Sequence, residues 1–122
     1  MSKERLFTAQ ITLKHAKDAA WKGNHDRAVA LSTETLTNDA LDTTLRLCFY
    51  DVRAESHVAQ GRLDMAEEDA LTMIALAQRE NDPSDRARAL NRQALVQMRQ
   101  GDLQTALQTA QTAVDAAQNS QD

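Results

Sequence analysis

The chain has 122 residues, a formal net charge of −4 and one cysteine, and these totals exclude several classes of protein. A chain of this length forms one domain that buries about two-thirds of its unfolded surface, so neither a disulfide nor a metal is needed to stabilise it. The lone Cys48 excludes an intramolecular disulfide and a cysteine-cluster metal site, which is typical of a reducing, cytoplasmic compartment. Residues 1–20 mix charges with apolar side chains, so we expect a soluble protein without a signal peptide or a membrane span.

The charge is spread unevenly, because residues 1–60 hold eight basic and eight acidic residues, whereas residues 61–122 hold six and ten. A nucleic-acid-binding module needs a basic stripe that neutralises phosphates and usually aromatic side chains that stack on bases. The chain has only four aromatic residues, Phe7, Trp21, Phe49 and Tyr50, so no nucleic-acid partner is predicted. With three glycines and one proline among many alanines, leucines and glutamines, the composition predicts an all-α fold.

Six helices are predicted, in residues 3–21, 25–37, 39–60, 63–80, 83–100 and 103–118. Between the first two stands AWKGNHDRA, in which Gly23 ends one helix in a left-handed cap and Asn24 caps the next. VAQGRLDMA separates the third and fourth helices in the same way, but Arg62 follows Gly61 there and predicts a weaker cap. Apolar residues at helical spacing predict a core face on the third helix: Leu41, Leu45, Phe49, Val52 and Ala59.

The fifth helix is predicted to begin in NDPSDRA, with Asp82 as the N-cap, Pro83 in the first position and Asp85 favourable to the helix dipole. The sixth helix follows MRQGDLQTA, where Gly101 makes the turn and Asp102 is the N-cap. Its predicted core face consists of Leu103, Ala106, Leu107, Ala110, Val114 and Ala117.

A glycine with an alanine five residues after it and another seven residues before it occurs three times, at spacings of 38 and 40 residues. The three triplets are Ala16, Gly23 and Ala28; Ala54, Gly61 and Ala66; and Ala94, Gly101 and Ala106. Glycine adopts the positive φ of a tight turn without strain, and the small alanines let two antiparallel helices approach closely. The pattern therefore predicts three helix-turn-helix repeats.

These repeats resemble the tetratricopeptide repeat (TPR), in which the first helix carries a small residue, a glycine closes the turn and alanine recurs in the second helix. The later small position of the second helix is matched by Ala113, whereas Thr35 and Met73 stand there in the other repeats. The period exceeds the usual one of about 34 residues. Such long repeats with few aromatics are similar to those of bacterial peptide-sensing regulators and of sensory segments attached to signalling enzymes.

The resemblance implies a single domain over residues 1–122, with repeats at about 3–38, 39–81 and 82–119, stacked as a right-handed α-solenoid (a TPR-like superhelix). It also implies a concave groove, lined by the first helix of each repeat, that holds an extended or helical peptide. Carried over position by position, the groove residues are Gln10, Leu13, Lys17 and Trp21; Cys48, Asp51, Glu55 and Val58; and Arg88, Asn91, Leu95 and Arg99. Trp21 is expected either to anchor a ligand or to pack over the first helix pair, and packing is favoured.

Family members that clamp a carboxylate tail use lysine and asparagine from the first two repeats and basic residues from the third. Arg88 and Arg92 match the third-repeat part, but Leu13, Lys17 and Val52 occupy the other places, so a chaperone-tail receptor is not predicted.

The arginines of the fifth helix need an opposing charge, since Arg88 and Arg92 are four residues apart and Arg99 returns to nearly the same face. One interpretation pairs them with Asp51 and Glu55 on the third helix. In the other interpretation they hold an acidic or C-terminal carboxylate group of a partner. Its apolar contacts would come from Leu13, Trp21 and Leu95.

No enzymatic, cofactor or metal site is predicted. The three histidines, His15, His25 and His57, form no i,i+4 pair with another ligand type, and they are expected to be packed or at the surface. The sequence contains no nucleophile elbow and no phosphate-binding glycine loop. The acidic run Glu67, Glu68 and Asp69 lies near a helix start, where it favours the helix dipole and is expected to face water.

The leading hypothesis is therefore a non-enzymatic interaction module or scaffold that binds a protein or peptide segment. Alternatives are an N-terminal sensory or regulatory segment of a larger signalling protein, and a small helical ligand- or metal-binding bundle. The segment TALQTAQTAVDAAQNSQ of the sixth helix covers its apolar side only partly. Because terminal repeats normally need a polar outer face, we also predict self-association, or contact with a following domain, through a terminal repeat.

Overall fold

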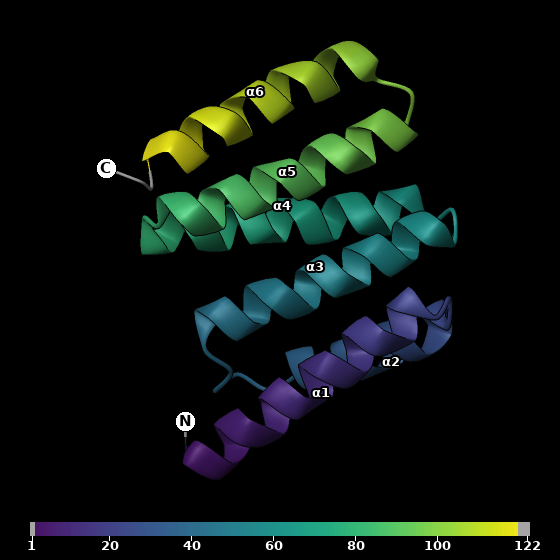
Figure 1. Cartoon of the computed structure of the whole chain (residues 1–122), viewed down its shortest axis with the longest axis vertical. Helices are drawn as coiled ribbons and strands as arrows, with labels where there is room; N and C mark the ends of the chain where they lie inside the picture. The colour runs from purple at the N-terminus through teal and green to yellow at the C-terminus, as the bar shows by residue number, and fades with distance from the viewer. Residues whose placement is uncertain (1, 120–122) are drawn as a thin grey trace.

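Six α-helices and no strands make up residues 2–119, the part of the chain that the computed structural model describes (Figure 1). They are α1 (Lys3–Trp21), α2 (His25–Leu36), α3 (Thr43–Ala59), α4 (Leu63–Glu80), α5 (Pro83–Arg99) and α6 (Leu103–Asn119). The helices follow one another along the long axis, with α1 at one end and α6 at the other (Figure 1). The prediction of an all-α chain with six helices is confirmed. None of the helices in this range has the length and apolar character needed to cross a membrane.

The three tight turns are made as the sequence predicts. Gly23, Gly61 and Gly101 have φ values of 83°, 77° and 85°, which lie in the left-handed region that favours glycine. Asn24 and Asp102 accept hydrogen bonds at their side chains from backbone N–H groups three residues later, at 3.3 Å in both cases. Arg62 makes no side-chain cap, as expected. These turns therefore depend on glycine for the backbone and on a short polar side chain for two of the three helix starts.

The start of α3 differs from the prediction, because this helix begins at Thr43 rather than at residue 39. The side chain of Asp42 accepts a hydrogen bond from the backbone N–H of Leu45 at 2.8 Å and so acts as the N-cap. Upstream, the Asn38 side chain accepts from the N–H of Ala40 at 3.0 Å. Short polar side chains that bond to nearby backbone compete with helical hydrogen bonds, which explains the late start. The other helix ends lie within one residue of the predicted ones.

Each helix packs on the next one in the chain, and α3 also contacts both α1 and α5. The alanines of the repeat triplets occupy these contacts and are all buried: Ala16, Ala28, Ala54, Ala66, Ala94 and Ala106. Their small size is what lets neighbouring helices approach. The largest fully buried side chain is Phe49 of α3, which lies in a cluster with Leu13 and Ala16 of α1.

Part of the predicted core is wrong. Ala59 of α3 is exposed, and on α6 the side chains of Leu103, Leu107 and Val114 are 60%, 73% and 49% exposed. The buried face of α6 consists instead of alanines: Ala106, Ala113 and Ala116. Within residues 2–119 only α5 packs against α6, so one stripe of α6 is covered and the stripe beside it is open.

Replacing Gly101 by valine is expected to destabilise the protein by about 1–3 kcal/mol through strain at its positive φ. An added Cβ meets no atom within 4 Å, so the cost comes from the backbone conformation and not from a clash. Thermal unfolding measured by circular dichroism checks this. Gly101→Asn is the control, since asparagine tolerates the left-handed region, and equal melting temperatures for valine and asparagine would contradict the assignment.

Candidate functional site

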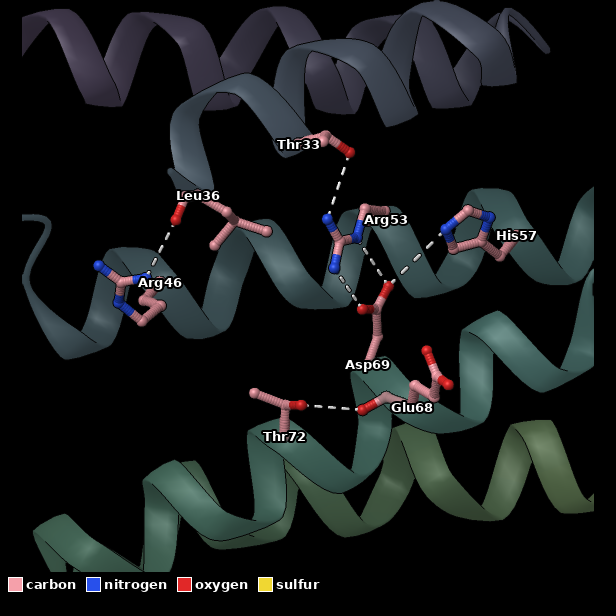
Figure 2. Close-up of polar contacts among 8 residues, drawn as sticks. All are labelled: Thr33, Leu36, Arg46, Arg53, His57, Glu68, Asp69 and Thr72. Carbon is pink, nitrogen blue, oxygen red and sulfur yellow. Dashed lines mark hydrogen bonds and ion pairs between the residues drawn. The ribbon is translucent and has the colours of Figure 1, made fainter. Parts of the chain in front are cut away.

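Two groups of polar residues are candidates for function, and the first is a partly buried cluster around α3, which reaches α2 on one side and α4 on the other (Figure 2). Arg53 of α3 donates two hydrogen bonds to the carboxylate of Asp69 on α4, from Nε to Oδ2 at 3.0 Å and from Nη2 to Oδ1 at 2.6 Å. Its Nη1 donates to the Thr33 hydroxyl of α2 at 3.2 Å. The guanidinium also lies 5.3 Å from the ring centroid of Tyr50, within range of a cation–π contact. One side chain thus links three helices.

The charges of this pair are mutually satisfied. The side chain of Asp69 is 5% exposed and that of Arg53 is 20% exposed. The hydrogen bonds to Asp69 raise the pKa of Arg53 above its ordinary value, in opposition to the partial burial that lowers it. A bidentate arginine–carboxylate pair leaves the carboxylate little capacity to bind anything else. The cluster is therefore suited to holding helices together rather than to binding a ligand.

His57 lies beside this pair and is almost completely buried. Its Nε2 is 4.0 Å from Oδ2 of Asp69, and its Nδ1 has no hydrogen-bond partner among the described residues. Burial lowers the pKa of His57, and the neighbouring Arg53 lowers it further, while Asp69 alone raises it. The imidazole is therefore neutral at neutral pH, as expected for a packed histidine.

Lowering the pH from about 7.5 to about 5.5 is expected to reduce the stability of the protein through His57. In the unfolded chain a histidine binds a proton near its ordinary pKa of about 6.5, whereas the folded state with its lowered pKa still excludes that proton. At pH values between the pKa of His57 in the folded state and its higher pKa in the unfolded state, the unfolded state binds more protons than the folded state. Stability therefore falls as the pH falls. Urea denaturation across this range should show a flatter pH dependence for His57→Gln than for the unmodified chain. His15→Gln, at an exposed position, is the control and should retain the slope.

The position of Asp69 corrects the expectation that the whole acidic run faces water. Glu67 and Glu68 are exposed, but Asp69 lies on the inward face of α4 between the buried Ala66 and Met73. The sequence did contain a sign of this burial, because Asp69 is three residues after Ala66 and four before Met73 and therefore shares their helix face, and because a neighbouring helix carries an arginine. No set of three or more potential metal ligands converges within residues 2–119.

The second candidate is an exposed face formed by α1, α3 and α5, which carries the residues predicted to line a groove. Lys17, Glu55 and Leu95 occupy equivalent positions of the three repeats and are all exposed. Trp21, four residues after Lys17, is 90% exposed, so the expectation that it packs over the first helix pair is wrong. Its position in the last turn of α1, beside the Gly23 turn, leaves it without a neighbouring helix to cover it. Leu13 is also placed differently from the prediction, because it is buried and offers no apolar contact to a partner.

Of the three α5 arginines that were expected to need an opposing charge, one is paired and two are accessible. Arg92 Nε lies 2.7 Å from Oδ1 of Asp51 on α3, which confirms an ion pair between these helices. Arg88 is exposed and its Nη1 lies 3.1 Å from the sulfur of Cys48. Within residues 2–119, Arg99 and Glu55 are exposed and form no ion pair. Of these three arginines, only Arg92 is therefore paired with an acidic residue of α3, as one interpretation of the sequence predicted.

This exposed face, called the odd-helix face below, differs in charge from the chain as a whole. Its exposed charges are Lys17, Arg88 and Arg99 against Glu55, a sum of +2 on a protein whose net charge is −4. Of the two candidates, only the odd-helix face presents charged and aromatic groups to a partner. The chain matched no protein-family model, no curated protein and no solved structure, so its function is inferred from this face.

Proposed function

We propose that the protein is a non-enzymatic binding module, a TPR-like right-handed solenoid of three repeats, whose odd-helix face binds an acidic peptide segment of a partner protein. The pattern of helix contacts supports the solenoid. α3 contacts both α1 and α5, whereas within the described range α2 does not contact α4 and α4 does not contact α6. This arrangement gathers the first helices of the repeats on one side. The three glycine turns and the buried alanines recur at the same positions in each repeat, which supports the same architecture.

The observation that carries the proposed function is the net positive charge of the odd-helix face on an acidic protein. Arg88 and Arg99 keep accessible guanidinium groups, which bind carboxylates through paired hydrogen bonds. Trp21 supplies a large apolar surface at the edge of the same face, and tryptophan is enriched among the residues that dominate binding energy. A peptide with acidic side chains and one apolar anchor therefore matches this face better than a basic or uncharged one.

Trp21 also provides the measurement, because it is the only tryptophan in the chain and its side chain is 90% exposed. Short acidic peptides are titrated into the protein at low ionic strength, at a concentration where it sediments as a monomer. Binding on the odd-helix face should shift the Trp21 emission to shorter wavelength as water is displaced, and added salt should weaken the binding. Basic and sequence-scrambled neutral peptides serve as ligand controls.

Replacing Arg88 and Arg99 together by glutamine is expected to weaken peptide binding by at least about ten-fold at low salt, with no change in thermal stability. The matched control replaces Arg62 and Arg79, which are exposed on α4 and its N-cap, away from the odd-helix face. If no acidic peptide shifts the emission of the unmodified protein, or if both double variants bind equally well, the proposal is wrong.

A further inference from the structure

Apart from Leu95, which also lies on the odd-helix face, the apolar side chains exposed at the two ends of the helix stack are not used by the proposed peptide site. On α1, Phe7 and Ile11 are 63% and 39% exposed. At the other end, α5 and α6 form an apolar surface, called the terminal groove, that includes Val114 of α6, which is 49% exposed. Its central pocket of about 370 Å³ is lined by Leu95, Met98, Leu103 and Leu107 among others. These four side chains are 37–73% exposed. Exposed apolar groups gathered in this way mark interaction surfaces.

The internal repeats show what normally covers a surface like the terminal groove. Subtracting 38 from residue numbers in the second repeat and 78 in the third gives equivalent positions. Val114 of α6 then corresponds to Leu36 of α2 and Ile74 of α4. Leu36 packs in the cluster that contains Phe49 of α3, and Ile74 packs in the cluster that contains Ala89 of α5. In the first two repeats this surface is therefore covered by the first helix of the next repeat, and in the third it is open.

The same numbering identifies the exposed face of α1 as the matching surface. Ile11 corresponds to Phe49 and to Ala89, the two residues that make those inter-repeat contacts, and both are fully buried. Phe7 corresponds to Leu45, which is buried against α1 in the same cluster as Phe49. The face of α1 that contains Phe7 and Ile11 is thus the face with which α3 and α5 pack onto the preceding repeat.

Polar contacts between repeats can be transferred in the same way. Arg92 of the third repeat forms an ion pair with Asp51 of the second. In a second copy that continued the stack, Lys14 would take the place of Arg92, and it would contact Asn91, which takes the place of Asp51 and lines the terminal groove. Both Lys14 and Asn91 are exposed. A lysine ammonium donates and the asparagine amide oxygen accepts, so the pair is compatible.

A second transferred contact involves the residue after each of these helices. Gln60 Nε2 donates to Asp26 of the preceding repeat at 2.6 Å, and its equivalent Gln100 donates to Glu67 at 3.0 Å. The position of Gln60 and Gln100 is occupied in the first repeat by Lys22, also a donor. The two acceptors are not at equivalent positions: in the third repeat Gln104, whose amide oxygen accepts, occupies the position of Asp26, whereas Leu107 occupies the position of Glu67.

The charges of the two helices are complementary as well. α1 contains four basic residues, Lys3, Arg5, Lys14 and Lys17, and two acidic ones, Glu4 and Asp18, which gives +2. α6 with its N-cap contains Asp102 and Asp115 and no basic residue, which gives −2. Opposite charges favour the approach of α1 to α6 from different molecules.

We infer that the terminal groove binds α1 of a second copy of this chain, so that the molecules associate head to tail and continue the internal stack of repeats. The contact is heterologous, because each copy uses its α1 face toward one neighbour and its terminal groove toward the other. Repetition of this contact produces chains of molecules rather than a closed pair.

One position in this contact is mismatched and offers a gain-of-affinity test. Asp18 corresponds to Val96, which packs with Ala54 and Ala66 between repeats. In a second copy Asp18 faces the equivalent alanines of the terminal groove, Ala94 and Ala106, where burial of a carboxylate is unfavourable. Asp18→Val is expected to tighten the association by about ten-fold, and Asp18→Asn to tighten it less.

The decisive experiment is analytical ultracentrifugation of two variants that are each blocked at one end. Phe7→Asp with Ile11→Asp disables the α1 face, and Leu107→Asp with Val114→Asp disables the terminal groove. Each variant alone should be monomeric, and an equimolar mixture should form a dimer and nothing larger, because one intact face remains on each partner. The unmodified chain should form species larger than dimers as concentration rises.

Leu71→Asp is the matched control, since Leu71 is 48% exposed on α4 away from both ends, and it should leave the association of the unmodified chain intact. Circular dichroism confirms that every variant is folded. A dimer of the α1-face variant alone would indicate an isologous contact between two terminal grooves and would overturn the inference. So would an unmodified chain that stays monomeric at high micromolar concentration together with a monomeric Asp18→Val variant.

Discussion

Replacing Phe49 by alanine is expected to lower the free energy of unfolding by about 3–5 kcal/mol. The ring is fully buried in α3 and lies in a cluster with Leu13 and Ala16, so its removal leaves a cavity as well as losing apolar burial. The backbones around it belong to packed helices and collapse only partly into the space. Urea denaturation followed by circular dichroism measures the change.

Phe7→Ala is the matched control, because Phe7 is the same residue type, lies on α1 one turn before Ile11, the equivalent of Phe49, and is 63% exposed. At a protein concentration low enough to keep the chain monomeric, this variant should change the free energy of unfolding by less than about 1 kcal/mol. Similar losses for the two phenylalanines would show that Phe49 does not lie in the main core.

Replacing Asp69 by asparagine is expected to cost about 2–4 kcal/mol. The substitution keeps the shape of the side chain but leaves the Arg53 guanidinium, which is 20% exposed, without its carboxylate. An unpaired, largely desolvated charge is far more unfavourable than the pair is favourable. Chemical denaturation at neutral pH measures the effect.

Two further variants test this explanation. Asp51→Asn breaks the ion pair with Arg92 and should cost less than Asp69→Asn, although the Arg92 side chain is only 15% exposed, because the Asp51 carboxylate is 28% exposed and accepts one hydrogen bond from the arginine instead of two. Replacing both Arg53 and Asp69 by leucine removes the charges together and should recover a substantial part of the loss seen in Asp69→Asn. Equal costs for Asp69→Asn and Asp51→Asn would contradict the assigned difference in burial.

The turns were predictable from sequence because their cause is local. A positive φ at Gly61 or Gly101 depends on the few residues of the turn itself, and so does capping by Asp102. The same locality explains why five of the six helix starts were placed correctly, while Asp42 and Asn38 shifted the start of α3 by bonding to nearby backbone.

The two candidate sites were less predictable because they depend on how helices are placed. Asp69 looked like one member of a solvated acidic run, and its pairing with Arg53 requires the relative rotation of α3 and α4. The exposure of Trp21, Leu103 and Leu107 likewise depends on whether another helix lies beside them. A helical pattern shows which side chains share a face, but not whether that face has a neighbour.

Contacts in this fold join only helices that are one or two places apart in the chain, so every tertiary contact closes a short loop within the described range. Such low contact order permits fast folding, because little chain entropy is lost before favourable packing is gained. It also means that no long-range contact ties the first helix to the last. Opening can then begin at either end, as loss of α1 or α6 alone, and amide protons of α3 and α4 are expected to exchange with solvent most slowly.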